Sequence, residues 1–207
     1  MGFLFTALCV AILVWAEFAE QRAIKIASKT AASSGFIAVA LALGLPFRGP
    51  AQQAIFVGLI FGMAGDLFLL SRQKRYFLLG LGSFLLNHVA FVVGFVLLGV
   101  DASLTAAAAL PLGLLAVAVW RWLSPHVGSL RAPVLAYIGI ISAMVASAVG
   151  AVPTVGSTLL IAAILFFTSD LCVARDRFIS PGPINRLFGL PLYYGGQLLF
   201  AWGVHAL

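Results

Sequence analysis

The chain contains eight apolar segments whose lengths suit a lipid bilayer, and this constrains its fold more than any other feature. The segments are roughly residues 2–16, 28–46, 53–71, 76–99, 103–123, 132–150, 156–174 and 187–206. An α-helix needs about 20 apolar residues to cross a hydrocarbon layer about 30 Å thick. Because 63% of residues are hydrophobic and only 9% are charged, an ordinary soluble domain is excluded. The sequence predicts an all-α, polytopic integral membrane bundle of eight transmembrane helices, with residues 1–207 forming a single transmembrane domain.

The first segment also allows a second interpretation, because 15 apolar residues before Glu17 resemble a signal peptide. A signal peptide carries a cationic region ahead of its apolar core. No Lys or Arg precedes Arg22, so we expect an uncleaved first helix.

Eleven of the twelve Lys and Arg residues lie in every second gap between the segments. They are Arg22, Lys25 and Lys29, then Arg72, Lys74 and Arg75, then Arg121 and Arg131, and finally Arg175, Arg177 and Arg186. The alternate gaps and the termini hold only Arg48. The positive-inside rule therefore predicts a multi-pass cell membrane protein with these gaps in the cytoplasm and both termini on the opposite side. The excess positive charge indicates contact with anionic lipid headgroups, and nothing in the pattern indicates nucleic-acid binding.

Two aspartates, Asp66 and Asp170, lie inside apolar segments near the predicted cytoplasmic side. They are half a chain apart, and each follows a small residue and precedes a leucine. An offset of four helices preserves orientation, which favours a 4+4 parallel repeat. Convergence of two helix ends on the same local sequence is the alternative.

A carboxylate within a membrane is unfavourable by roughly 2.5 to 3.5 kcal/mol, so it normally faces the bundle interior and has a partner. Taking the segment ends as helix ends, Asp66 lies about 7 Å and Asp170 about 6 Å from the cytoplasmic surface. Gly58, Gly62 and Asp66 share one helix face, and the two glycines form a GxxxG element that allows close helix approach. We therefore expect Asp66 to point into a helix contact.

Further polar residues are predicted to reach the same region of the bundle. They are Lys29, Asn87, His88, Tyr137, Tyr194 and Gln197, with Arg175 at the cytoplasmic surface. Structural roles remain open for each of them. The aspartates could form salt bridges with Arg72 or Arg175, His88 could be a hydrogen-bonded core residue, and the tyrosines could belong to an interfacial belt.

Several chemistries lack their motifs in this sequence. There is no GxSxG nucleophile elbow, and the scattered histidines form neither HExxH nor HxxxH, which disfavours a zinc site. Paired-carboxylate chemistry on a lipid, or ion-coupled transport, remains. The Pro181-Gly182-Pro183 stretch predicts the longest cytoplasmic loop, of about a dozen residues, which we interpret as a candidate lid.

The ordered set of polar and aromatic residues resembles the YhhN-like lysoplasmalogenase family. The residues that carry the resemblance are Lys29, Gly65-Asp66 with Leu69, Phe77 with Gly80, Phe84, His88, Tyr137 with Met144, Phe166 or Phe167 before Ser169-Asp170, and Tyr194 with Gln197. The resemblance covers nearly the whole chain. Two positions depart from the family pattern as we know it: Thr30 stands where proline is expected, and Phe91 where tyrosine is expected.

The resemblance implies hydrolysis of the vinyl ether bond of a lysoplasmalogen, an alkenyl-glycerophosphoethanolamine or -choline. The products would be a fatty aldehyde and a glycerophosphodiester, and no metal or organic cofactor would be required. Asp66 and Asp170 would be the catalytic pair, one protonated and one ionised, as in glycoside hydrolysis. Lys29 and Arg175 would bind the lysophospholipid phosphate.

The remaining predicted binding residues would position water and the ether oxygen; they are His88, Asn87, Tyr137, Tyr194 and Gln197. The partners are then the lysophospholipid and the surrounding lipids, and the oligomeric state is not predicted. The rival interpretations are a proton-coupled transporter with Asp66 and Asp170 as its relay, and another intramembrane lipid hydrolase.

Overall fold

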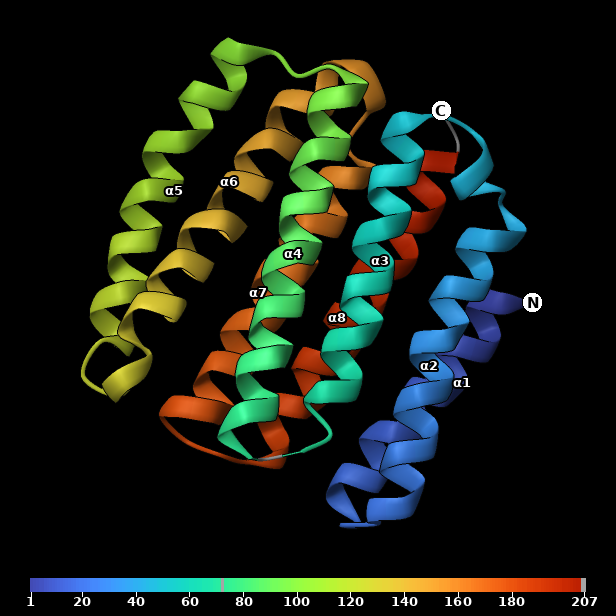
Figure 1. Ribbon diagram of the computed structural model, residues 1–207, viewed down its shortest axis with the longest axis vertical. Helices are drawn as coiled ribbons and strands as arrows, with labels where there is room; N and C mark the ends of the chain where they lie inside the picture. Colours follow the sequence, from blue (N-terminus) through green and yellow to red (C-terminus); the bar gives the residue numbers. More distant parts are fainter. Residues whose placement is uncertain (72, 206–207) are drawn as a thin grey trace.

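The computed structural model describes residues 1–71 and 73–205, and within them every regular element is helical. The eight α-helices are α1 (Gly2–Phe18), α2 (Arg22–Ala42), α3 (Pro50–Phe68), α4 (Lys74–Leu98), α5 (Ala102–Leu123), α6 (Arg131–Val155), α7 (Thr158–Phe178) and α8 (Pro183–His205). Two 3-10 turns, η1 (Leu45–Phe47) and η2 (Gly128–Leu130), precede α3 and α6 (Figure 1). This confirms the predicted all-α class.

Six of these helices, α2 to α7, are long and apolar enough to cross a membrane, so the chain is a multi-pass membrane protein. The prediction of eight spans is thereby supported for six helices. Helix α1 is apolar but has only 17 residues, and α8 does not meet the hydropathy criterion. Helix α8 is less apolar because it carries polar side chains such as Asn185 and Gln197. These side chains are buried inside the bundle, where they contact protein instead of lipid.

Helix α8 contacts α1, α2, α3 and α7, and one face of it is buried while the other is exposed. On the other side of the bundle α4 packs against α3 and α6, and α6 also packs against α7 (Figure 1). Helix α5 lies outermost against α6, and its apolar span is exposed. An apolar helix that faces outward is what contact with lipid requires.

The predicted glycine face of α3 accommodates side chains from two neighbouring helices. A methyl group at Gly58 would lie 2.5 Å from the Phe91 ring of α4. A methyl group at Gly62 would collide with the Gln197 amide of α8. The GxxxG element therefore permits close packing against α4 and α8 together, and it brings Asp66, which is 2% exposed, into the interior.

The connections α1–α2, α3–α4, α5–α6 and α7–α8 lie at one end of the bundle, and both chain termini lie away from it (Figure 1). These are the connections that carry most of the positive charge, so we call this the cationic end. The prediction of a dozen-residue loop before α8 is wrong. Helix α7 continues through Arg175 and Arg177 to Phe178, so only residues 179–182 join it to α8.

Candidate active site

A cavity of about 330 Å³ extends into the bundle from the cationic end, and residues from all eight helices line it. Asp66 of α3 and Asp170 of α7 both lie on its walls. The lining also includes Phe84, Tyr137 and Tyr193. The fold thus brings the two predicted aspartates, 104 residues apart, into one compartment.

Asp66 has a cationic partner and a hydroxyl partner, both from α2. Lys29 Nζ lies 3.2 Å from Asp66 Oδ1, and the Ser33 hydroxyl donates to Asp66 Oδ2 at 2.7 Å. Lys29 and Ser33 are four residues apart, so they lie one turn apart on the same face of α2. The Tyr194 hydroxyl of α8 lies 3.0 Å from the Ser33 oxygen and 3.3 Å from the Lys29 carbonyl oxygen, to which it donates. Asp66 is therefore a buried ion-paired carboxylate.

Asp170 has a different set of partners, contributed by α4 and α6. The Tyr137 hydroxyl donates to Asp170 Oδ2 at 2.6 Å, and His88 Nε2 lies 3.1 Å from the same oxygen. His88 Nε2 is also 2.9 Å from the Tyr137 oxygen, while its Nδ1 lies 3.2 Å from Met144 Sδ. His88 is fully buried, whereas the Asp170 side chain is 15% exposed. Asp170 therefore belongs to a compact Asp, His and Tyr cluster whose carboxyl group reaches the cavity.

The two clusters are built in parallel ways. Ser33 precedes Asp66 by 33 residues, and Tyr137 precedes Asp170 by the same number; each hydroxyl donates to its aspartate. The first cluster draws on α2, α3 and α8, and the second on α6, α7 and α4. A shift of four helices converts one set into the other.

Arg175, predicted to bind phosphate, does not line the cavity, and its guanidinium donates to Asn185 Oδ1 at 2.6 Å. The reason is rotation about α7. Arg175 follows Asp170 by five residues, or about 140° around the helix, whereas Arg177 returns to within about 20° of the Asp170 direction. Arg177 does line the cavity, with its guanidinium 4.2 Å from the Phe77 ring centre. Arg72, considered as a partner of Asp66, lies outside the described residues.

Four other predicted binding residues do not line the cavity: His88, described above, and three more that lie behind its wall. Tyr194 supports Ser33, as described above. Gln197 is fully buried and donates through Nε2 to the Tyr193 hydroxyl at 3.1 Å. Asn87 is fully buried, and its amide atoms have no hydrogen-bond partner among the described residues. These residues support or back the wall and do not face the cavity.

The helix ends also change the predicted depths of the aspartates. Asp66 lies two residues before the end of α3, but Asp170 lies eight residues before the end of α7. The estimate of equal distances assumed that α7 ends where its apolar segment ends. Instead α7 extends about one turn further, and its charged residues form part of the cavity mouth.

Several residues of the site were not predicted from the sequence. Ser33 could have been found from its spacing to Lys29, and Tyr193 from its spacing to Gln197, since both pairs are four residues apart. Four charged residues at the mouth, Glu17, Lys25, Asp176 and Arg186, gave no such signal because they come from separate helices. In the part of the chain that the structure describes, no three His, Cys, Asp or Glu side chains gather to hold a metal ion.

The fold and site define a class: a polytopic helical membrane protein with two differently partnered carboxyl groups in one cavity. A family model described as the YhhN family matches residues 3–204, and the chain belongs to this family. This confirms the resemblance noted from the sequence.

Curated relatives point the same way. A bovine protein named lysoplasmalogenase TMEM86A is 30% identical over 209 residues, which covers 95% of this chain and 85% of the relative. The human protein of that name is 30% identical over 208 residues with the same coverage. A lysoplasmalogenase of Mycobacterium bovis is 30% identical over 172 residues, covering 79% of this chain and 63% of that protein. No solved structure matches the chain. On the evidence of these relatives, the chain is an enzyme.

Proposed function

We propose that this protein is a lysoplasmalogenase-like hydrolase that cleaves the vinyl ether bond of an alkenyl lysophospholipid. The relatives named above support the activity. The single observation that supports the chemistry is that Asp66 and Asp170 line one cavity with different partners, a lysine for the first and a histidine and tyrosine for the second. The products are a fatty aldehyde and a glycerophosphodiester.

The cavity has the two kinds of surface that a lysophospholipid needs. Its mouth is charged, and its wall on the side of α5 and α6 is apolar, with Val119, Leu123, Val134, Ile138 and Ile141. An alkenyl chain along this wall remains in apolar surroundings while the headgroup stays at the membrane surface. The bond between them then lies near the aspartates.

Asp66 is suited to act as the ionised group. The Lys29 ammonium at 3.2 Å and the Ser33 hydroxyl at 2.7 Å both stabilise a carboxylate and offset part of the cost of burying it. A fixed carboxylate at this position stabilises the positive charge that develops on the substrate, and it accepts a proton from the attacking water. Lys29 therefore acts through Asp66 in this proposal and does not bind phosphate.

Asp170 is suited to act as the proton donor. Its contacts with Tyr137 and His88 both fall on Oδ2, so Oδ1 is the oxygen that hands the proton to substrate in this proposal. His88 Nε2 lies 3.1 Å from the same oxygen as the Tyr137 hydroxyl, so His88 helps to orient the carboxyl group. Tyr137 holds Asp170 in place through its hydroxyl hydrogen bond.

The reaction requires both groups in sequence. Asp170 protonates the β-carbon of the enol ether, using the electron pair of the double bond, and an oxocarbenium ion forms. Water adds to the cationic carbon and loses a proton to Asp66. The hemiacetal then breaks its bond to the glycerol oxygen, which takes the proton held by Asp66. The hemiacetal hydroxyl gives its proton to Asp170 as the aldehyde forms, so both carboxyl groups return to their starting states. The division of labour between two carboxyl groups follows the logic of glycosidases.

Membrane orientation and internal repetition are part of the proposal. The charge on the cationic end supports a cytoplasmic location for this end, so the cavity would receive substrate from the inner leaflet. The matching pairs of helices around the two aspartates support an ancestral duplication of four helices, with α1–α4 equivalent to α5–α8.

The test is aldehyde release from a purified enzyme in detergent micelles, measured by mass spectrometry. D170N should lower turnover by about 10²- to 10⁴-fold, the usual contribution of general acid catalysis. D66N should also abolish turnover. The matched control is D101N, the same substitution at an exposed aspartate that caps α5 at the opposite end. Wild-type turnover in both D66N and D170N, or no aldehyde from the wild type, would refute the proposal.

A further inference from the structure

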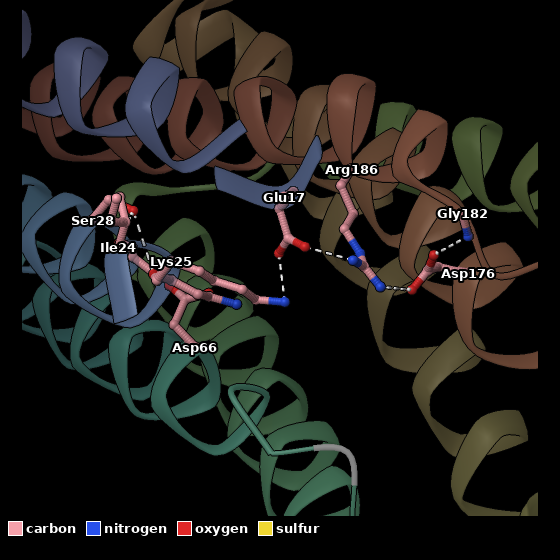
Figure 2. A network of polar contacts seen from close by, with 9 residues as sticks. Glu17, Ile24, Lys25, Ser28, Asp66, Asp176, Gly182 and Arg186 are labelled. Carbon is pink, nitrogen blue, oxygen red and sulfur yellow. Dashed lines mark hydrogen bonds and ion pairs between the residues drawn. The ribbon is translucent and has the colours of Figure 1, made fainter. Parts of the chain in front are cut away.

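Four charged side chains form a continuous network at the mouth of the cavity. Glu17 of α1 pairs with Lys25 of α2 at 2.7 Å and with Arg186 of α8 at 2.5 Å. Arg186 also lies 3.2 Å from Asp176 of α7. Figure 2 shows Glu17 between Lys25 and Arg186, with Asp176 beyond Arg186. All four residues line the cavity, so the network borders the space through which a ligand passes.

The network is held in place by contacts behind it. Asp176 Oδ1 accepts from the Gly182 N–H at 2.9 Å and from Asn185 Nδ2 at 3.3 Å. Asn185 in turn donates to the Ser180 carbonyl oxygen at 2.7 Å. These bonds tie the short α7–α8 connection to Asp176 and Asn185. The interpretation of this connection as a lid stays a prediction.

The rise along α2 between this network and the partner of Asp66 is close to the length of the glycerol backbone of a lysolipid. Lys25 and Lys29 are one turn apart on the same face of α2, which is a rise of about 6 Å. Lys25 belongs to the mouth, and Lys29 holds Asp66. In a lysophospholipid, five bonds join phosphorus to the sn-1 oxygen, and they span about 6 Å at bond lengths near 1.5 Å. A phosphate at Lys25 therefore places the vinyl ether at the level of Asp66.

The charges of the network favour a ligand that carries both signs. The two acids and two bases cancel formally, and each base is already paired with a carboxylate. A phosphate that binds Lys25 and Arg186 must displace a carboxylate, which would then be left unpaired beside a second anion. A ligand with its own ammonium group restores that pairing. An anionic ligand does not, and like charges at this distance repel.

We propose that Glu17, Lys25, Asp176 and Arg186 form a binding site for a zwitterionic phosphodiester headgroup. Lys25 and Arg186 bind the phosphate, and Glu17 and Asp176 bind the amine. The network exchanges its internal ion pairs for ion pairs with the headgroup, and it discriminates against headgroups with a net negative charge. This inference rests on the proposed function, because it names the residues that bind and select the headgroup of that substrate.

The experiment compares three substrates with one alkenyl chain and different headgroups: glycerophosphoethanolamine, glycerol phosphate without an amine, and glycerol without phosphate. The ratio of kcat/KM values is measured by aldehyde release in micelles. E17Q should lower the value for the ethanolamine substrate about tenfold and raise it for the glycerol phosphate substrate. R186Q should lower kcat/KM about tenfold for both phosphate-bearing substrates and leave kcat/KM for the alkenylglycerol unchanged.

Matched controls are available at the same end of the bundle. E20Q removes an exposed acid close to Glu17, and R75Q removes an arginine that contacts Gln73 and does not line the cavity. Neither should change the ratio. Turnover of the alkenylglycerol reports whether each variant is folded and competent. If R186Q does not fold, K25Q replaces it, and K25Q should change the three kcat/KM values in the same way.

The outcomes separate the two proposals. If the wild type cleaves alkenyl substrates but E17Q and R186Q leave the headgroup ratios unchanged, the headgroup site is refuted and the proposed function stands. If the wild type cleaves none of them, the proposed function fails. The headgroup site is then judged by binding of the non-cleavable 1-alkyl ethanolamine lysolipid, which E17Q should weaken and E20Q should not; equal binding by both overturns it.

Discussion

The buried ion pair between Lys29 and Asp66 allows structural and chemical roles to be separated. At 3.2 Å and an effective dielectric constant near 20, the attraction between the two charges is about 5 kcal/mol before desolvation is considered. K29M removes this attraction and leaves a carboxylate whose side chain is 3% exposed. Loss of one partner of a buried pair normally costs about 3 to 5 kcal/mol. The Ser33 bond remains, so we expect the lower end of that range.

The double variant K29M/D66N tests the reasoning further. An amide at position 66 is neutral and still accepts the Ser33 hydroxyl bond. The double variant should therefore recover much of the lost stability, giving a coupling free energy of about 2 kcal/mol or more between the two sites. Catalysis should not recover, because an amide neither accepts the proton from water nor stabilises a cation as a carboxylate does.

The assay combines two measurements on the same detergent-solubilised samples. Reversible unfolding followed by circular dichroism gives the free energy of unfolding for the four members of the cycle, and mass spectrometry gives aldehyde release. If the free energy of unfolding of K29M lies within about 0.5 kcal/mol of the wild-type value, the energetic argument is refuted, because changes of that size are typical of surface positions. A double variant with wild-type turnover would show that Asp66 has a structural role only.

Two further predictions concern packing and pH. G62A should lower the free energy of unfolding by about 1 to 3 kcal/mol and reduce turnover, because its methyl group meets the Gln197 amide and lies 3.2 Å from the Tyr193 hydroxyl. The control is G139A, whose methyl group has nothing within 4 Å. Equal melting temperatures for G62A and G139A would contradict this prediction. Bonds from the Ser103 hydroxyl and the Leu104 N–H lower the pKa of the Asp101 carboxyl. Its cap should therefore stabilise the fold above the pKa of the unfolded state and lose this effect as pH falls through the lower folded value. D101A should have a lower melting temperature than the wild type at pH 7, and the difference should shrink below about pH 4. A difference in melting temperature that does not change with pH would exclude the ionised carboxylate as its cause.

Much of the architecture follows from local properties of the chain. Hydropathy and length predict each helix, because a backbone in lipid must satisfy its own hydrogen bonds and a helix does so within one segment. The same local argument singled out Asp66 and Asp170, since a carboxylate in an apolar segment is unfavourable without a partner. It also predicted the glycine face of α3, because helical spacing alone shows that Gly58, Gly62 and Asp66 share a direction.

Contacts between helices could not be predicted from local sequence, because the rotation of each helix, its register and its neighbours depend on packing of the whole bundle. The sequence by itself determined the helical membrane fold, the two intramembrane acids and the family. Only the tertiary structure decided that Lys29 pairs with Asp66 while His88 and Tyr137 pair with Asp170, and that Arg177 instead of Arg175 faces the cavity. Only folding brings charges from α1, α2, α7 and α8 together at one mouth, since no spacing along a single helix records that meeting.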